Sequence, residues 1–134
     1  MNISQAARRS GLNPKTIRYY ESIGLIAPAG RGANGYRCYD GRAVQELQFL
    51  ARSREVGFDI EECRQLLGLY RDPARHSAHA RELVLEKHRR LQERIEQLRA
   101  MQTVLADMAG RCHGDEGPEC AIIDDLAGRE ADRV

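Results

Sequence analysis

Residues 77–108 contain neither proline nor glycine, the two residues that most often end a helix. Within this segment apolar side chains recur every seven residues, at Val84, Leu91, Leu98 and Leu105. The intervening heptad positions are held by His88, Ile95, Gln102 and Ala109. A heptad pattern of this length predicts one long helix whose apolar side pairs with another helix.

The apolar side of this helix needs a partner, because a lone helix would leave it in water. Two partners are possible: a second copy of the chain, or the chain's own N-terminal helices. We expect a homodimer joined by a coiled coil. The polar residues His88 and Gln102 weaken such a seam but help to fix its register.

The first 24 residues contain the residues that typically begin and end two short helices. Ser4 is expected to cap a helix that Gly11 ends, and Asn13 and Pro14 begin a second helix that Gly24 stops. Two short helices joined by a tight turn predict a helix-turn-helix.

Residues 28–39 are rich in turn formers and contain Asn34-Gly35, a strong signal for a hairpin turn. Tyr36 and Cys38 alternate with Arg37 as in a strand. The segment therefore predicts a small β-hairpin, or wing, beside the helix-turn-helix.

Two further helices precede the long one. Asp40 is expected to cap a helix through Arg54, and Asp59 with Glu62 forms a capping box for the next. Asp72-Pro73 then breaks the chain. We predict a mostly α fold in three parts: a winged helix-turn-helix DNA-binding domain at 1–71, a dimerisation helix at 72–110, and a loop with a short helix and tail at 111–134.

Charge is distributed unevenly along the chain, although the net charge is only +1. Residues 1–37 carry six basic residues and the single acid Glu21, whereas residues 109–134 carry three arginines and seven acids. A basic helix-turn-helix and wing indicate binding to DNA phosphates and base edges. The side chains that we expect to contact DNA are Lys15, Thr16, Arg18, Tyr19, Arg31, Asn34, Tyr36, Arg37 and Arg54.

The four cysteines fit a cytoplasmic protein better than a disulfide framework. No apolar run reaches membrane length, and residues 1–20 lack a signal-peptide core, so we expect no membrane contact and reduced thiols. Cys38 and Cys63 are expected to be small packing residues.

Cys112 and Cys120 are separated by seven residues that include two glycines and a proline, so the loop can oppose their sulfurs. Two thiolates suit a soft d¹⁰ monovalent ion, Cu(I) first. Exposed thiols or a redox pair are the alternatives that the residues leave open. An enzyme is not expected, because the chain has no C-x-x-C, no phosphate-cradling glycine loop and no plausible triad.

Several motifs resemble the MerR family of transcription regulators, and the resemblance covers residues 1–126. They are T-I-R-Y-Y-E at 16–21, G-L-I at 24–26, N-G-Y-R-C-Y at 34–39 and V-G-F-D-I-E-E at 56–62. The resemblance implies a dimer joined by an antiparallel coiled coil. It also implies an operator between the −35 and −10 elements, and activation by distortion of the overlong promoter spacer so that RNA polymerase engages both elements.

Within this family, the residue at the start of the long helix lies beside the partner's metal loop, and divalent-metal sensors have cysteine there. Here the position is Ser77, as in the copper-efflux regulators of the CueR type. The resemblance thus implies one Cu(I), Ag(I) or Au(I) per subunit on Cys112 and Cys120. The alternative is a Zn(II)-type sensor that recruits His113 and His79 as further ligands.

Overall fold

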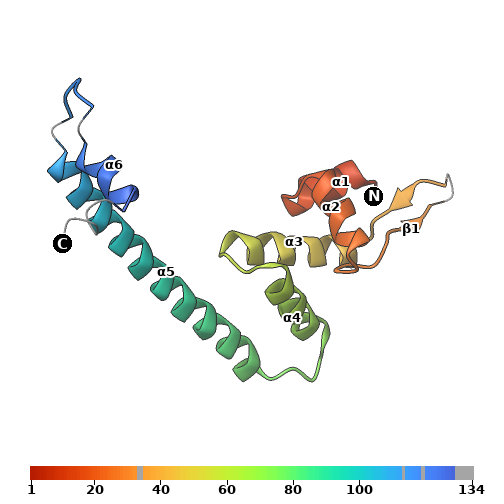
Figure 1. Ribbon diagram of the computed structural model, residues 1–134. Coiled ribbons are helices and arrows are strands. Elements are labelled where there is room, and N and C mark those ends of the chain that lie inside the picture. The colour runs from red at the N-terminus through yellow and green to blue at the C-terminus, as the bar shows by residue number, and fades with distance from the viewer. Residues whose placement is uncertain (33–34, 113, 119, 129–134) are drawn as a thin grey trace. The chain divides into compact units, whose positions relative to one another are not determined.

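The computed structural model describes residues 1–32, 35–112, 114–118 and 120–128. The chain divides into two compact units, Met1–Val84 and Leu85–Val134. The first unit contains α1 to α4, the β-hairpin and the start of α5; the second contains the rest of α5 and α6 (Figure 1). The mostly helical fold predicted from the sequence is confirmed.

The helix-turn-helix consists of α1 (Ile3–Ser10) and α2 (Pro14–Ser22). The predicted cap of α1 was wrong by two residues. Asn2 caps the helix, because its side chain accepts from the Gln5 N–H while the Gln5 side chain accepts from the Asn2 N–H. Gly11 ends α1 at φ 82°, a left-handed conformation that favours glycine. Asn13 caps α2 as predicted.

The wing is an antiparallel hairpin of β1 (Gly30–Arg31) and β2 (Arg37–Cys38), in which Gly30 pairs with Cys38 and Arg31 with Arg37. Its strands are only two residues long. The turn is closed by the Gly32 N–H, which donates to the Tyr36 carbonyl at 2.9 Å. Asn34, the first residue of the predicted turn pair, lies outside the described residues. Cys38 is exposed, so the packing role expected for it was wrong.

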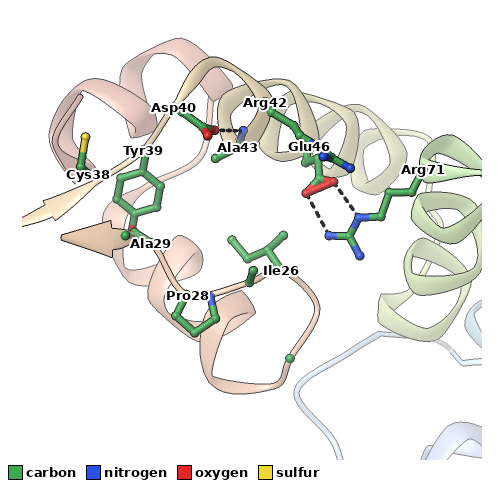
Figure 2. Close-up of a pocket in the computed structure, with 13 residues that line it drawn as sticks. Ile26, Pro28, Ala29, Cys38, Tyr39, Asp40, Arg42, Ala43, Glu46 and Arg71 are labelled. Carbon is green, nitrogen blue, oxygen red and sulfur yellow. Dashed lines mark hydrogen bonds and ion pairs between the residues drawn. The ribbon is translucent and has the colours of Figure 1, made fainter. Parts of the chain in front are cut away.

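Two capped helices complete the helical part of the first unit. The Asp40 carboxylate accepts from the Ala43 N–H and begins α3 (Gly41–Glu55), as Figure 2 shows. Asp59 and Glu62 form the predicted capping box of α4 (Ile60–Arg71). In this unit α1 packs against both α2 and α3, and α4 packs against α3.

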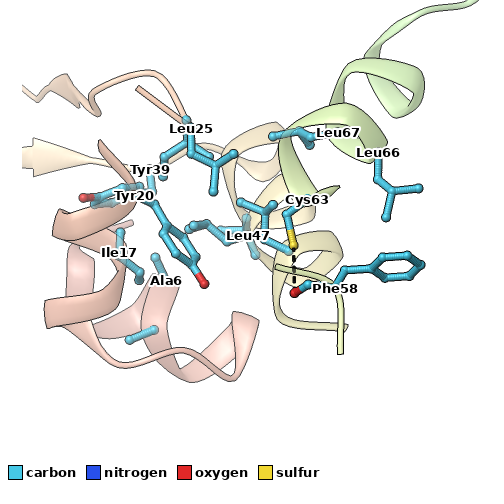
Figure 3. Close-up of a cluster of buried hydrophobic side chains, with 14 residues drawn as sticks. Ala6, Ile17, Tyr20, Leu25, Tyr39, Leu47, Phe58, Cys63, Leu66 and Leu67 are labelled. Atoms are coloured by element: carbon cyan, nitrogen blue, oxygen red, sulfur yellow. Dashed lines mark hydrogen bonds between the residues drawn. The ribbon is translucent and has the colours of Figure 1, made fainter. Parts of the chain in front are cut away.

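A single cluster of buried side chains joins these helices to the end of the wing (Figure 3). Ile17 and Leu47 are completely buried, and Tyr39 is 1% exposed. Each large apolar side chain buried in this way contributes about 1.5–3 kcal/mol. Cys63 is also completely buried, with its sulfur 3.7 Å from the Phe58 carbonyl, which confirms its packing role.

The long helix α5 runs over Ser77–Arg111, three residues further than the sequence predicted, and α6 over Ala121–Leu126. The heptad residues of α5, Val84, Leu91, Leu98 and Leu105, are 45–63% exposed in the single chain. Within the described part of the second unit, Leu91, Leu98 and Leu105 are therefore left uncovered. None of the helices in the described ranges is both long and apolar enough to cross a membrane.

Candidate nucleic-acid interface and thiol site

The second helix of the helix-turn-helix presents a basic outer face. Lys15, Arg18 and Tyr19 are exposed, whereas Ile17 and Tyr20 on the opposite side are buried. The side chains of α2 thus lie on an exposed side and a buried side, as the sequence predicted. Thr16 is half-buried, and its backbone N–H donates to the Asn13 side chain at 2.7 Å, which fixes the start of the helix.

The wing carries three further predicted contact residues, Arg31, Tyr36 and Arg37, and all three are exposed. Arg31 donates to the Gly35 carbonyl at 3.0 Å, so its guanidinium lies along the turn of the hairpin. Arg37 instead reaches back to α2, where its Nη1 atom lies 2.5 Å from Glu21 Oε2. One predicted DNA-contact residue is therefore already bound to a carboxylate of the neighbouring helix.

Glu21 also accepts a hydrogen bond from the Tyr39 hydroxyl, at 2.5 Å on its other oxygen, Oε1. Burial of Tyr39, together with the adjacent Glu21 carboxylate, raises the pKa of this phenol to about 12. This bridge was not predicted from the sequence. Its signal was the isolation of Glu21, the single acid among the basic residues of 1–37.

Arg54, at the end of α3, is exposed and donates to the Phe58 carbonyl at 3.0 Å. It also approaches the Tyr20 hydroxyl; burial raises the Tyr20 pKa, and Arg54 opposes that shift. The structure thus gives Arg54 a place in the turn between α3 and α4 while leaving it accessible.

An open cleft of about 640 Å³ lies between the base of the wing and the start of α3 (Figure 2). The Glu46 carboxylate in this cleft accepts from Arg71 Nε at 2.6 Å and from Arg71 Nη2 at 2.9 Å. These hydrogen bonds lower the pKa of Glu46. Because the ion pair joins α3 to α4, we assign it to the stability of the unit rather than to ligand binding.

The second unit brings Cys112 and Cys120 together. Cys112 follows α5, Cys120 precedes α6, and their sulfurs lie 3.1 Å apart, both half-buried. The Ile123 N–H at the start of α6 and the Cys112 thiol lower the pKa of Cys120. The hydrogen bond to Cys120 raises the pKa of Cys112. Cys120 is therefore the more readily ionised of the two thiols.

An ion pair holds the ends of the loop in place. Arg111, the last residue of α5, binds the carboxylate of Asp125 in α6 and lies 3.1 Å from Asp107. Within the loop, the Asp115 side chain accepts from the Gly117 N–H at 2.9 Å, and Gly114 adopts a φ of 64°. These contacts fix the ends of the loop that carries the two cysteines.

Ser77 is the exposed first residue of α5 and belongs to the first unit. The nearby His76 and His79 are exposed, with ring centroids 5.8 Å apart. His113 lies outside the described residues. Among residues that the structure describes, no group of three or more His, Cys, Asp or Glu side chains is gathered as a metal site, so the described donor set near the loop is the two sulfurs.

A helix-turn-helix with a wing, followed by a long helix with an unpaired apolar stripe, defines a DNA-binding transcription regulator rather than an enzyme. Residues 2–39 match the model of the MerR family regulatory proteins, and residues 44–108 match the model described as MerR, DNA binding. The chain belongs to the MerR family.

The chain is similar over its length to known regulators. It is 48% identical to the HTH-type transcriptional regulator HmrR of Rhizobium leguminosarum bv. viciae, covering 95% of this chain and 98% of the relative. It is 44% identical to the regulator CueR of Salmonella typhimurium, covering 96% and 93%. The crystal structure of PbrR691 from Ralstonia metallidurans CH34 in complex with lead(II) is 29% identical, with a TM-score of 0.84 over 94% of this chain and 98% of that one.

Proposed function

We propose that this regulator binds promoter DNA as a homodimer and activates metal-efflux or detoxification genes when Cu(I), Ag(I) or Au(I) binds Cys112 and Cys120. One ion binds per subunit, in the reducing cytosol. The observation that carries the proposal is the 3.1 Å separation of the two sulfurs at the junction of α5 and α6. The three proposed parts are DNA binding by 1–71, dimerisation by 72–110 and metal sensing by 111–134.

The donor set favours a monovalent ion. Soft thiolates select soft d¹⁰ ions, and two of them with one M⁺ leave a net charge of −1. The N–H groups at the start of α6 already lower the pKa of Cys120, so they favour negative charge at this place. Opposed sulfurs in a linear complex stand roughly 4.6 Å apart, twice a metal–sulfur bond of ~2.3 Å. Side-chain rotation must therefore separate the sulfurs when the ion enters.

Ser77 is proposed to exclude divalent ions. A cysteine at this position would add a third thiolate, which suits M²⁺, whereas a hydroxyl adds no charge. The resemblance to copper-efflux regulators, in which this position lies beside the partner's metal loop, supports this role. Its test is Ser77→Cys, which should raise Zn(II) affinity relative to Cu(I) affinity.

The DNA interface is proposed to use Lys15, Thr16, Arg18 and Tyr19 of α2 in the major groove. The wing and the end of α3 contact flanking phosphates through Arg31, Asn34, Tyr36, Arg37 and Arg54. The operator lies between the −35 and −10 elements. Effector binding favours a DNA-bound shape that distorts the spacer for RNA polymerase, which requires that the ion bind that shape more tightly than the other.

The deciding experiment is an anaerobic titration of the purified dimer with Cu(I) and with Zn(II), followed by X-ray absorption of the bound ion. We expect one Cu(I) per subunit with two short sulfur bonds, lost in Cys112→Ser and Cys120→Ser. Cys38→Ser is the matched control, because Cys38 is an exposed thiol elsewhere in the chain. Retention of tight Cu(I) binding by both loop variants would refute the site.

A divalent-metal sensor is the second candidate, and one observation favours testing it. The structurally similar protein PbrR691 was crystallised in complex with lead(II), a divalent ion. In this candidate His113 and His79 would join the thiols. Tight Zn(II) binding with mixed sulfur and nitrogen ligands, weakened by His79→Gln, would establish it in place of the monovalent site.

A further inference from the structure

The wing cannot hold its position by its own pairing. Its two strands contribute two residues each, and a hairpin of that size is at best marginal in water. Its register also places Arg31 directly opposite Arg37. Like charges at facing positions destabilise a strand pair. Something outside the hairpin must therefore stabilise it.

Glu21 has the geometry for this task. It comes from the end of α2, its side chain is only 6% exposed, and each of its oxygens meets a different residue of the wing. Oε2 accepts a hydrogen bond from the Arg37 guanidinium, and Oε1 accepts one from the Tyr39 hydroxyl. Tyr39 directly follows β2, two residues after Arg37. The carboxylate thus neutralises one of the two facing arginines and joins the wing to the helix that carries the basic face.

The Tyr39 end of this bridge is held in place by burial and by a backbone hydrogen bond. Tyr39 is 1% exposed within the buried cluster, and its N–H donates to the Met1 carbonyl at 2.6 Å. Asp40, the next residue, caps α3. The Tyr39 end of the bridge is therefore anchored in the buried cluster and beside the start of α3.

We propose that Glu21 is a positioning residue for DNA recognition, which sets the wing against α2 and orients the Arg37 guanidinium toward a flanking phosphate. Arg37 is 47% exposed and binds Glu21 through Nη1, so the rest of its guanidinium remains available. This inference rests on the proposed function, in that α2 and the wing are taken as the DNA-contacting parts.

Whether Glu21→Gln weakens or tightens DNA binding separates this positioning role from a purely electrostatic one. Removing a negative charge from a DNA-binding surface should tighten binding if charge alone matters. If Glu21 positions the wing, the same substitution should weaken binding, by about tenfold, as expected for the loss of one to two phosphate contacts. The slope of log Kd against log salt should fall by about one.

The DNA probe is a duplex selected from a random-sequence library by the wild-type protein. In Glu21→Gln, hydroxyl-radical footprinting should show that protection by α2 is retained and that protection of the deoxyriboses beside the outer flanking phosphates is lost. Glu55→Gln is the matched control, since it removes the same charge from an exposed residue of α3. Unchanged or tighter binding by Glu21→Gln, with the outer protections intact, would overturn the proposal.

A second measurement needs no DNA. In hydrogen exchange, Glu21→Gln and Tyr39→Phe should each speed exchange of the Gly32 amide of the wing while leaving that of Leu47 in α3 unchanged. In the double variant, the exchange rate of the Gly32 amide should rise by less than the product of the two separate increases, because both substitutions act through the same carboxylate. Slow wing exchange in both variants refutes the proposal. A wild-type protein that selects no DNA refutes the proposed function instead, so the two failures are distinguishable.

Discussion

The sulfurs of Cys112 and Cys120 lie 3.1 Å apart, yet their surroundings shift the two pKa values in opposite directions. Backbone N–H groups at the start of α6 and the Cys112 thiol lower the pKa of Cys120. The shared hydrogen bond raises the pKa of Cys112. Cys120 is therefore the first of the two thiols to lose its proton as pH rises.

This difference predicts selective alkylation of the metal-free protein. Because thiolates react and thiols do not, iodoacetamide at neutral pH should label Cys120 before Cys112. Peptide mass spectrometry with short labelling times measures the order. In Cys120→Ala, labelling of Cys112 should accelerate, since the hydrogen bond that raises its pKa is gone. Equal labelling rates in the wild type would contradict the assignment.

The ion pair of Glu46 with Arg71 predicts a loss of stability in acid. Arg71 lowers the pKa of Glu46, so the folded state favours the carboxylate. The contribution is complete above the unfolded value near 4.5 and disappears as pH falls through the lower folded value. Glu46→Gln should cost about 1 kcal/mol at pH 7, a value reduced for screening because the Arg71 side chain is 38% exposed.

Urea unfolding of the wild type and Glu46→Gln at pH 7 and at pH 3 tests this prediction. The difference between the two proteins should be present at pH 7 and smaller at pH 3. Glu55→Gln, on the same helix but exposed, should show no such pH-dependent difference. A difference that grows in acid would have the wrong sign for a lowered carboxyl pKa.

The exposed stripe of α5 predicts that a charge within it dissociates the proposed dimer. Leu98 is 45% exposed in the single chain and occupies a heptad position. Leu98→Glu should raise the dimer dissociation constant at least about a hundredfold, because two apolar side chains per dimer are lost from the seam. Sedimentation equilibrium measures the constant. Thr103→Glu, on the same helix outside the heptad seam, should remain dimeric.

The ion pair between Arg111 and Asp125 predicts that the loop proposed to bind Cu(I) is pre-organised. Asp125→Asn should weaken Cu(I) binding at the proposed site by about tenfold, because the ion pair holds the two ends of the loop together. Competition with a Cu(I) chelator measures the change. Glu116→Gln removes an equal charge from the exposed loop and should leave the affinity within about twofold. Equal losses in the two variants would point to charge instead of loop geometry.

Strong local signals made most of the helices predictable. Asn13, Asp40 and the Asp59–Glu62 box each cap the helix assigned to them, since a cap needs only residues three positions apart. The error at α1 has the same cause. Both Asn2 and Ser4 are good capping residues, and only Asn2 has a glutamine three residues later that returns a hydrogen bond.

Long-range pairings were harder to predict. Nothing local to Glu21 indicates Tyr39 and Arg37, because the bridge forms only when the wing folds back onto α2. Cys38 was misjudged for a related reason: strand alternation does not say which face of a two-residue strand is covered. The loop cysteines were easier to pair, because the short loop between them already limits how far apart they can lie.

The fully buried members of the cluster in the first unit all lie between Ala6 and Leu67 in the sequence. A substitution between Cys112 and Cys120 therefore leaves no void in that core. Under the proposed function, the residues that select the ion can then change over evolution without disturbing the core that supports the residues proposed to contact DNA.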